Sequence, residues 1–277
     1  MTLKIATFNV NSVKSRIPVL AEWFDSEGAP DILCLQETKC VDAEFPRYFF
    51  EDYYTSCCVS GMKSYNGVAI LSKKEPDEIS FGLGDAGEEG REESERARVA
   101  FARFGKLYVL NTYIPQGKEI DHPDYAYKLR FIARVRGLLE RRCTPEDAVV
   151  WVGDLNVAPT DIDVTNPKNK KNHVCFHEDV RRALAGAMEW GLVDSFPRAS
   201  AGGWRIHILG LSYKRLAIAQ YRLAYRPYTR DEERGGPLPV SACGAQPARE
   251  GKAFGPYSRR SGIRYVAAVP ASSCLRA

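Results

Sequence analysis

Polar side chains stand at the ends of three apolar segments of this chain. Asn9 closes a segment of alternating apolar residues, Glu37 follows the apolar run after Pro30, and Asp154 with Asn156 follows a third run. Carboxylate and amide oxygens are the ligands that hard divalent cations prefer. Such an ion promotes phosphodiester hydrolysis, and a carboxylate at the end of an apolar strand is a candidate base for the attacking water. These residues therefore predict a metal-assisted hydrolytic site.

Two side chains could add to this chemistry. Tyr113, beside a rigid Pro-Gln-Gly turn, could offer its phenol, and Asn156 could donate a hydrogen bond to a phosphate. Taken singly, a polar residue at a strand end is more often a cap, and a tyrosine more often lies at the edge of a core. We expect the capping role for Asp161 and Asp163.

The spacing of apolar residues predicts the elements that position these groups. Alternating or continuous apolar runs favour strands over residues 3–10, 31–36, 67–72, 99–104, 106–112 and 148–152, with a hairpin turned at Gly105. Helical spacing favours helices over residues 17–24, 129–139 and 177–190. This alternation is typical of an α/β domain with a mixed sheet.

Composition limits the class of protein. With 44% hydrophobic and 27% charged residues and no apolar run near the roughly 18 residues that span a bilayer, we expect no membrane segment. The first ten residues do not resemble a secretion signal, so we expect a cytoplasmic protein. The 8 cysteines show neither a CxxC pair nor zinc-ligand spacing, and we expect reduced thiols.

Charge is distributed unevenly along the chain. Residues 197–277 carry a net charge of +10, from 14 basic and 4 acidic residues, whereas residues 1–196 carry −6. Within the first part, the acidic stretch at residues 88–95 and the basic side of the helix with Arg130 and Arg134 are both expected to be solvated. The change in composition near Pro197 marks a boundary.

Five strings, in this order, carry a family resemblance. They begin at Leu3, Pro30, Tyr65, Asn111 and Gly153 and read LKIATFNVNSVKSR, PDILCLQETK, YNGVAILS, NTYIPQG and GDLNVAPTDID. The string WGLVDSF, which starts at residue 190, continues the series. Together they resemble the successive signatures of the exonuclease III family of AP endonucleases, within the endonuclease/exonuclease/phosphatase superfamily, over residues 1–196.

The resemblance assigns roles to the strand-end residues. It implies that Asn9, Glu37, Asp154 and Asn156 form the metal site, and that Tyr113 is the active-site phenol. Asp154 and Asn156 become the water-activating and phosphate-binding pair. The implied cofactor is Mg²⁺ or Mn²⁺.

The resemblance also implies a fold, a substrate and its contacts. The fold is a four-layer α/β sandwich of two mixed β-sheets flanked by helices. The partner is double-stranded DNA with abasic sites or 3′ blocks, which a monomeric enzyme incises and trims. Asn11 and Arg16 fall where the family approaches DNA.

The chain departs from the family after residue 196. Motifs reading Trp-Asp-Tyr-Arg, Arg-Ile-Asp and Ser-Asp-His-x-Pro should follow and do not. Codon degeneracy allows residues 204–212, 219–230 and 252–262 to be encoded by DNA that spells these motifs when read one base later, in order and at one offset. We therefore interpret residues 197–277 as an out-of-frame translation, with the shift at the codons of Phe196 and Pro197.

This interpretation divides the chain into an incomplete nuclease domain, residues 1–196, and a basic, poorly ordered tail, residues 197–277. We expect the second sheet to lack its C-terminal strands. Because the lost motifs would supply an acidic group and an Asp-His pair, we also expect the unmodified chain to be inactive or nearly so.

Two alternatives remain open. A catalytically dead nucleic-acid-binding protein could use the basic tail as a disordered arm, although a genuine arm has no reason to conceal three family motifs. A relative acting on phosphoinositides or sphingomyelin would share the metal chemistry, but the NTYIPQG string and the segment with Lys14 and Arg16 disfavour it.

Overall fold

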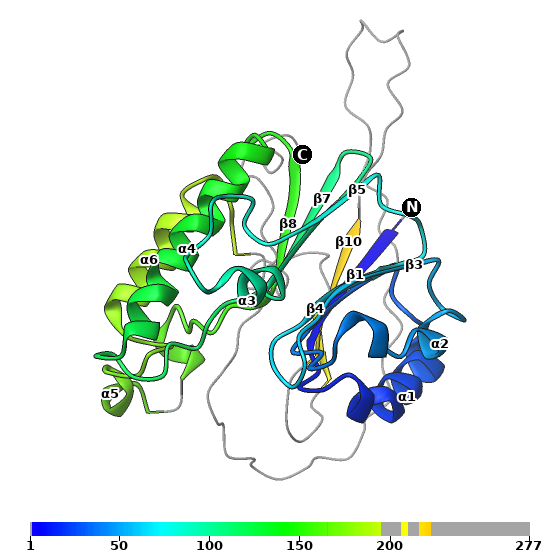
Figure 1. Cartoon of the computed structure of the whole chain (residues 1–277), viewed down its shortest axis with the longest axis horizontal. Coiled ribbons are helices and arrows are strands. Elements are labelled where there is room, and N and C mark those ends of the chain that lie inside the picture. Colours follow the sequence, from blue (N-terminus) through cyan, green and yellow to red (C-terminus); the bar gives the residue numbers. More distant parts are fainter. Residues whose placement is uncertain (1, 165, 195–205, 210–215, 223–277) are drawn as a thin grey trace, which may run out of the picture.

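Two β-sheets lie at the centre of the molecule (Figure 1), in a computed structural model that describes residues 2–164, 166–194, 206–209 and 216–222. The strands of the first sheet are β1 (Thr2–Asn9), β2 (Ile32–Gln36), β3 (Ser56–Ser60), β4 (Val68–Ser72), β9 (Ile206–Leu209) and β10 (Leu216–Arg222). The strands of the second are β5 (Glu78–Phe81), β6 (Val99–Phe104), β7 (Leu107–Tyr113) and β8 (Ala148–Asp154). Their orders are β3-β4-β2-β1-β10-β9 and β5-β6-β7-β8, and both sheets are mixed.

Helices cover the outer side of each sheet. The helices and 3₁₀ turns are η1 (Lys14–Arg16), α1 (Ile17–Glu27), η2 (Asp42–Glu44), α2 (Arg47–Phe50), α3 (Glu92–Arg96), α4 (Pro123–Arg142), η3 (Asp161–Asp163), α5 (Pro167–Lys170) and α6 (Glu178–Met188). Figure 1 shows α1 and α2 on one side of the sheets and α4 and α6 on the other. No helix in the described part of the chain is long and apolar enough to cross a membrane.

Strand alternation divides the apolar side chains of the first sheet between two cores. Ile32 and Cys34 of β2 pack with Val109 and Val152 of the second sheet, in the core between the sheets. Their neighbours Leu33 and Leu35 point to the opposite face, because successive side chains of a strand alternate. There they join the core beneath α1.

The second sheet repeats this arrangement on its own outer face. Leu110 and Trp151 pack against Phe131 and Val135 of α4 and Leu184 of α6. Three apolar cores therefore separate four layers, in the order helices, sheet, sheet, helices. The four-layer α/β sandwich expected from the sequence is confirmed.

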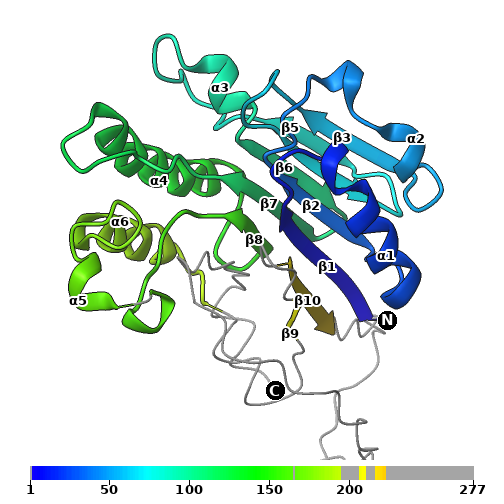
Figure 2. The same cartoon turned by 90° about the horizontal axis from the view of Figure 1, so that it is seen from below.

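The two described strands of the basic segment extend the first sheet. β10 pairs antiparallel with β1, from Thr2↔Arg222 to Thr7↔Ala217, and β9 pairs antiparallel with β10. Figure 2 shows β10 beside β1. In the described residues the second sheet has four strands and ends at β8. Most of residues 197–277 lies outside the described residues, so the domain boundary and the shifted reading frame stay predictions.

Most predicted elements are present within a few residues of their expected limits. β6 and β7 form the expected hairpin, since Phe104 pairs with Leu107 across a two-residue turn that contains Gly105. The capping role of Asp163 is also confirmed, because its Oδ2 accepts hydrogen bonds from the Thr160 amide at 3.0 Å and hydroxyl at 2.7 Å. The short strands β3 and β5 were not predicted.

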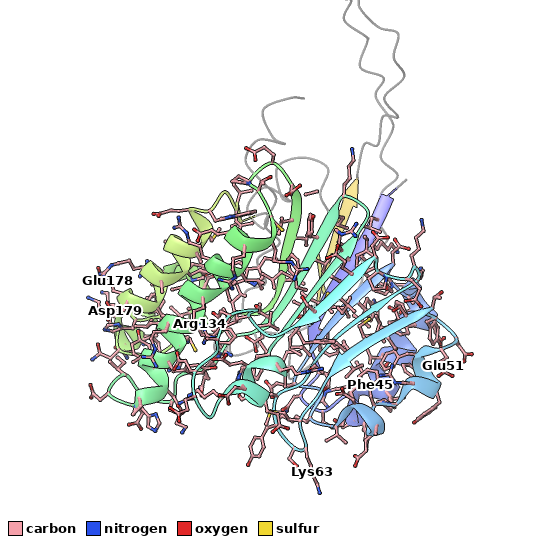
Figure 3. The ribbon with its side chains drawn as sticks, turned by 45° about the horizontal axis from the view of Figure 1, so that its top comes forward. Phe45, Glu51, Lys63, Arg134, Glu178 and Asp179 are labelled. Carbon is pink, nitrogen blue, oxygen red and sulfur yellow. The ribbon has the colours of Figure 1, made fainter. Side chains whose placement is uncertain are left out.

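The expectation that residues 88–95 and the basic side of α4 are simply solvated is only partly right, because most of residues 88–95 are exposed or half-buried while several of these charges pair with one another. Arg134 pairs with Asp85 and with Glu95, each at 2.6 Å, and Arg130 pairs with Glu88 at 2.8 Å. Glu95, the fourth of the five residues of α3, is only 3% exposed. These five residues form a set that we call the arginine cluster (Arg134 is labelled in Figure 3). Neither the acidic stretch nor the basic side of α4, taken alone, shows that the other lies against it.

Candidate active site

The carboxyl ends of two parallel strand pairs, one from each sheet, carry the predicted site residues. Asn9 pairs with Gln36 as the last pair of β1 and β2, and Glu37 follows directly. Tyr113 pairs with Asp154 as the last pair of β7 and β8. Polar side chains at such ends point out of the edge of the sheet rather than into the apolar core. α/β folds bind their ligands at this edge.

The side chain of Asn9 joins the two sheets. Its Nδ2 donates to Glu37 Oε1 at 2.7 Å and to Asp154 Oδ2 at 2.7 Å. The residues Asn9, Glu37 and Asp154 are buried, at 0%, 9% and 2% exposure respectively. We call the group formed by Asn9, Glu37, Tyr113, Asp154 and Asn156 the strand-tip site.

Asn156 is fixed next to Asp154 by its own loop. Its backbone N–H donates to Asp154 Oδ1 at 3.1 Å, and its Nδ2 donates to the carbonyl of Ile114 at 2.8 Å. The Ile114 N–H in turn donates to the Asp154 carbonyl at 2.9 Å. The loops that follow β7 and β8 are therefore joined by hydrogen bonds. The five predicted metal and catalytic residues lie in one region.

Unusual backbone conformations mark this edge. Glu37 (φ 53°) and Asn156 (φ 48°) lie in the left-handed region, which is uncommon for residues other than glycine. Gly153 (φ 131°) precedes Asp154, and a Cβ there would lie 1.9 Å from the Thr112 carbonyl oxygen. Such conformations concentrate at functional sites, because the surrounding structure must hold them in place.

Tyr113 lies against a half-buried arginine, Arg98. The Arg98 guanidinium carbon is 4.7 Å from the centre of the Tyr113 ring, and Arg98 also donates to the Tyr113 carbonyl at 3.1 Å. Burial, together with the negative charge of Glu37, raises the pKa of the Tyr113 hydroxyl, while Arg98 opposes the shift. The phenol therefore stays protonated and able to donate a hydrogen bond at neutral pH.

The two predicted DNA-binding residues differ in their relation to the site. Asn11 is adjacent, because its N–H donates to Asn9 Oδ1 at 3.1 Å and its side chain accepts from Lys39. Lys39 also lies 3.0 Å from Glu37 Oε2. Arg16, in η1, instead donates to the Ser15 hydroxyl at 3.4 Å.

A buried polar network below the site ties the sheets together. Asn111 of β7 donates to the carbonyls of Leu35 and Ala69 in the first sheet, each at 3.0 Å. Gln36 Nε2 donates to Asn111 Oδ1 at 2.7 Å. Because hydrogen bonds are directional, this network fixes how the two sheets sit against each other, and with it the approach of Glu37 to Asp154.

The residues present fit a hard divalent cation. In the described residues no group of three or more His, Cys, Asp or Glu side chains is placed to hold a metal ion. Mg²⁺, however, is usually bound by one or two carboxylates with the remaining positions left to water. Glu37 and Asp154, which share one amide donor, supply such a pair. Asn9 turns its nitrogen toward them and its oxygen toward the Asn11 amide, so its role as a ligand stays a prediction.

Lys128 was not identified from the sequence, although it is part of this region. It lies on the apolar side of α4, fully buried, and its Nζ donates to the Asn156 carbonyl at 2.6 Å. The signal was a lysine at helical spacing within the stripe formed by Tyr125, Ile132 and Val135. For Arg98, which comes just before β6, we find no comparable signal.

Comparison with known proteins agrees with this fold and site. The model of the endonuclease/exonuclease/phosphatase family matches residues 6–208. The chain belongs to this family, which is a class of hydrolases built on the two-sheet sandwich described above. The match begins within β1 and includes all five residues of the strand-tip site.

Individual relatives show which members of the family the chain is similar to. The chain is similar to a DNA-(apurinic or apyrimidinic site) endonuclease of Dictyostelium discoideum, with 31% identity over 72% of this chain and 54% of the relative. It is also similar to an exodeoxyribonuclease of Bacillus subtilis, with 32% identity over 70% of this chain and 74% of the relative. The solved structure of an AP endonuclease from Archaeoglobus fulgidus superposes with a TM-score of 0.67 and 39% identity, covering 78% of this chain and 86% of that protein. The chain thus spans little more than half the length of the Dictyostelium relative.

Proposed function

We propose that this chain is by descent a divalent-metal-dependent DNA-repair phosphodiesterase of the exodeoxyribonuclease III and AP endonuclease type. Its substrate would be double-stranded DNA with abasic sites or 3′ blocks, and its metal Mg²⁺ or Mn²⁺. The observation that carries the proposal is the meeting of Glu37 and Asp154, from different sheets, on one amide of Asn9. The names of the relatives give the substrate class.

Each residue of the strand-tip site has a role in this proposal. Glu37 and Asp154 would hold the metal ion, which when bound supplies a positive charge for the phosphate and its leaving oxygen. Asp154 would accept a proton from the attacking water. Asn156 and the protonated Tyr113 would donate hydrogen bonds to phosphate oxygens, where negative charge grows in the transition state. Asn11 and Arg16 would approach the DNA backbone.

We further propose that residues 197–277 are read out of frame and that the unmodified chain has little activity. The support for the shifted frame is the set of three family motifs that residues 197–277 spell when read one base later; the family model itself matches residues 6–208 and so extends 12 residues beyond Phe196. The test compares two proteins, the unmodified chain and a repaired chain whose gene lacks one nucleotide at the codons of Phe196 and Pro197. Each is assayed for Mg²⁺-dependent incision of a duplex with one abasic site.

We expect rapid incision by the repaired chain and little or none by the unmodified chain. Equal turnover by both would refute the proposed impairment. Failure of both to cut, in folded preparations, would refute the nuclease assignment. If the unmodified chain instead binds DNA in a strongly salt-dependent way, and deleting residues 197–277 abolishes that binding, the nucleic-acid-binding alternative is favoured.

A further inference from the structure

A lysine ammonium group is completely enclosed behind the strand-tip site. Lys128 of α4 has no exposed surface. Its Nζ donates to three backbone carbonyls, those of Gln116 at 3.0 Å, Asn156 at 2.6 Å and Val174 at 2.9 Å. An ammonium group has three N–H donors, so its hydrogen-bonding capacity is used completely.

The three carbonyls belong to three different segments around the site. Gln116 lies in the loop after β7, three residues beyond Tyr113, and Asn156 lies in the loop after β8, two residues beyond Asp154. Val174 lies in the segment that leads to α6. One side chain therefore ties both catalytic loops to each other and to the helical layer behind them.

This arrangement is costly for stability. Removing an ammonium group from water costs several kcal/mol. The carbonyl partners are neutral and offset only part of it. Burial accordingly lowers the pKa of Lys128 to about 8.

The loops are shaped to receive this side chain. A Cβ at Gly117 would lie 3.3 Å from Lys128 Cδ, and Gly117 itself has a φ of 99°. Asn156, whose carbonyl makes the shortest of the three bonds, has a φ of 48°. Gly117 adopts its positive φ readily because it has no Cβ, whereas the left-handed backbone of Asn156 needs support from its surroundings, and Lys128 donates to the Asn156 carbonyl.

We propose that Lys128 is a positioning residue that fixes the two loops that follow Tyr113 and Asp154, the second of which carries Asn156, in the geometry that binds the metal ion. It acts through backbone carbonyls and touches neither substrate nor ion. The metal-binding part of this inference rests on the proposed function, whereas the loop-fixing part does not.

The test uses the full chain and three variants. Lys128→Met removes the ammonium group, Lys128→Arg keeps a cation with several donors, and Arg136→Met is the matched control. Arg136 lies on the same helix and also holds a backbone carbonyl, that of Gly186 at 2.8 Å, in the helical layer. Two quantities are measured: backbone hydrogen exchange without metal, and Mn²⁺ affinity by calorimetry.

We expect Lys128→Met to speed exchange at residues 116–117 and 155–158 by at least about tenfold relative to β6, which reports global unfolding. Mn²⁺ affinity should fall about tenfold, the usual effect of losing a group that orients metal ligands. Lys128→Arg should recover part of both effects, and Arg136→Met should show neither. If exchange in Lys128→Met rises evenly over the whole chain, or its Mn²⁺ affinity equals that of the unmodified chain, the proposal is overturned.

Two results would change how the experiment is carried out or interpreted. If Lys128→Met does not fold, Lys128→Gln, with two donors and no charge, replaces it under the same criteria. If the unmodified chain itself does not bind Mn²⁺, the proposed function loses support, and hydrogen exchange alone then decides whether Lys128 fixes the loops.

Discussion

The strand-tip site and the arginine cluster both bury carboxylates, but they neutralise them differently. In the cluster, Arg134 donates to both oxygens of Glu95, at 2.6 and 2.8 Å. At the strand tips, the hydrogen bonds that link Glu37 to Asp154 come from the neutral amide of Asn9. A guanidinium built into the fold makes a carboxylate a structural group. The amide of Asn9 adds no positive charge to the two carboxylates that it links, and the ammonium group of Lys39 lies 3.0 Å from one of them, Glu37.

The largest expected effect is on catalysis at the strand tips. Asp154→Asn in the repaired chain should lower abasic-site incision about a thousandfold, because it removes both a metal ligand and the proposed base. The free energy of unfolding should fall by only about 1 kcal/mol, because the new NH2 group would face one of the two donors that the carboxylate accepts from, Asn9 Nδ2 or the Asn156 N–H. Incision rates and urea denaturation measure the two effects. If Asp154→Asn is strongly destabilised but cuts DNA normally when folded, the proposed difference between the strand-tip site and the arginine cluster is contradicted.

The opposite pattern is expected in the arginine cluster. Arg134→Met should lower the free energy of unfolding by about 3 kcal/mol, because it leaves Glu95 buried without its guanidinium partner. Incision by the folded fraction of the repaired chain should be nearly unchanged. Denaturation curves and rates corrected for the folded fraction test this. As a control, Arg182→Met removes the exposed pair with Glu178 and should cost less than about 1 kcal/mol.

A smaller effect is expected from the phenol at the site. Tyr113→Phe keeps the ring on Arg98 and removes one hydrogen-bond donor. Incision by the repaired chain should fall about a hundredfold with KM nearly constant, because the donor acts on charge that develops in the transition state. Steady-state kinetics give both constants. A change confined to KM would assign the hydroxyl to substrate binding instead.

The smallest effect concerns acid stability of the arginine cluster. Hydrogen bonds from Arg134 and Arg130 lower the pKa of Asp85 and Glu88, respectively. Their folded pKa values lie below the unfolded ones, so their stabilisation is present at neutral pH and is lost as pH falls below about 4. Denaturation at pH 5, 4 and 3 should show this loss, and Asp85→Asn should reduce it by about 1 kcal/mol after allowance for solvent screening. Identical pH profiles for the two proteins would contradict it.

The sequence revealed the residues of the strand-tip site because each stands where an apolar run ends. The positions of Asn9, Glu37 and Asp154 at the ends of apolar runs, and the order of the family motifs, predict one site. The structure brings these residues together. Their contact could not be derived from spacing alone, because it depends on how the two sheets face each other. That orientation involves the buried network of Gln36 and Asn111, which reads in the sequence only as polar residues within strands.

Interactions between distant charges were not predictable in the same way. The arginine cluster joins Asp85 to Arg134, 49 positions apart, and both segments looked solvated in the sequence. Lys128 was hidden for a related reason, since a lysine in an apolar stripe is usually assigned to the helix edge. In both cases the sequence shows the charges, whereas only the packing of α4 shows which groups they meet.

The division of Glu37 and Asp154 between two sheets has a consequence for resistance to heat and proteases. An ion held by both carboxylates would clamp the layers, and by mass action each hundredfold excess over its dissociation constant adds about 2.7 kcal/mol to the folded state. The melting temperature would then depend on the concentration of free metal. Chelation of the metal ion would remove this stabilisation. The two sheets would then separate first at the strand ends that carry the carboxylates, where proteases could cleave the chain.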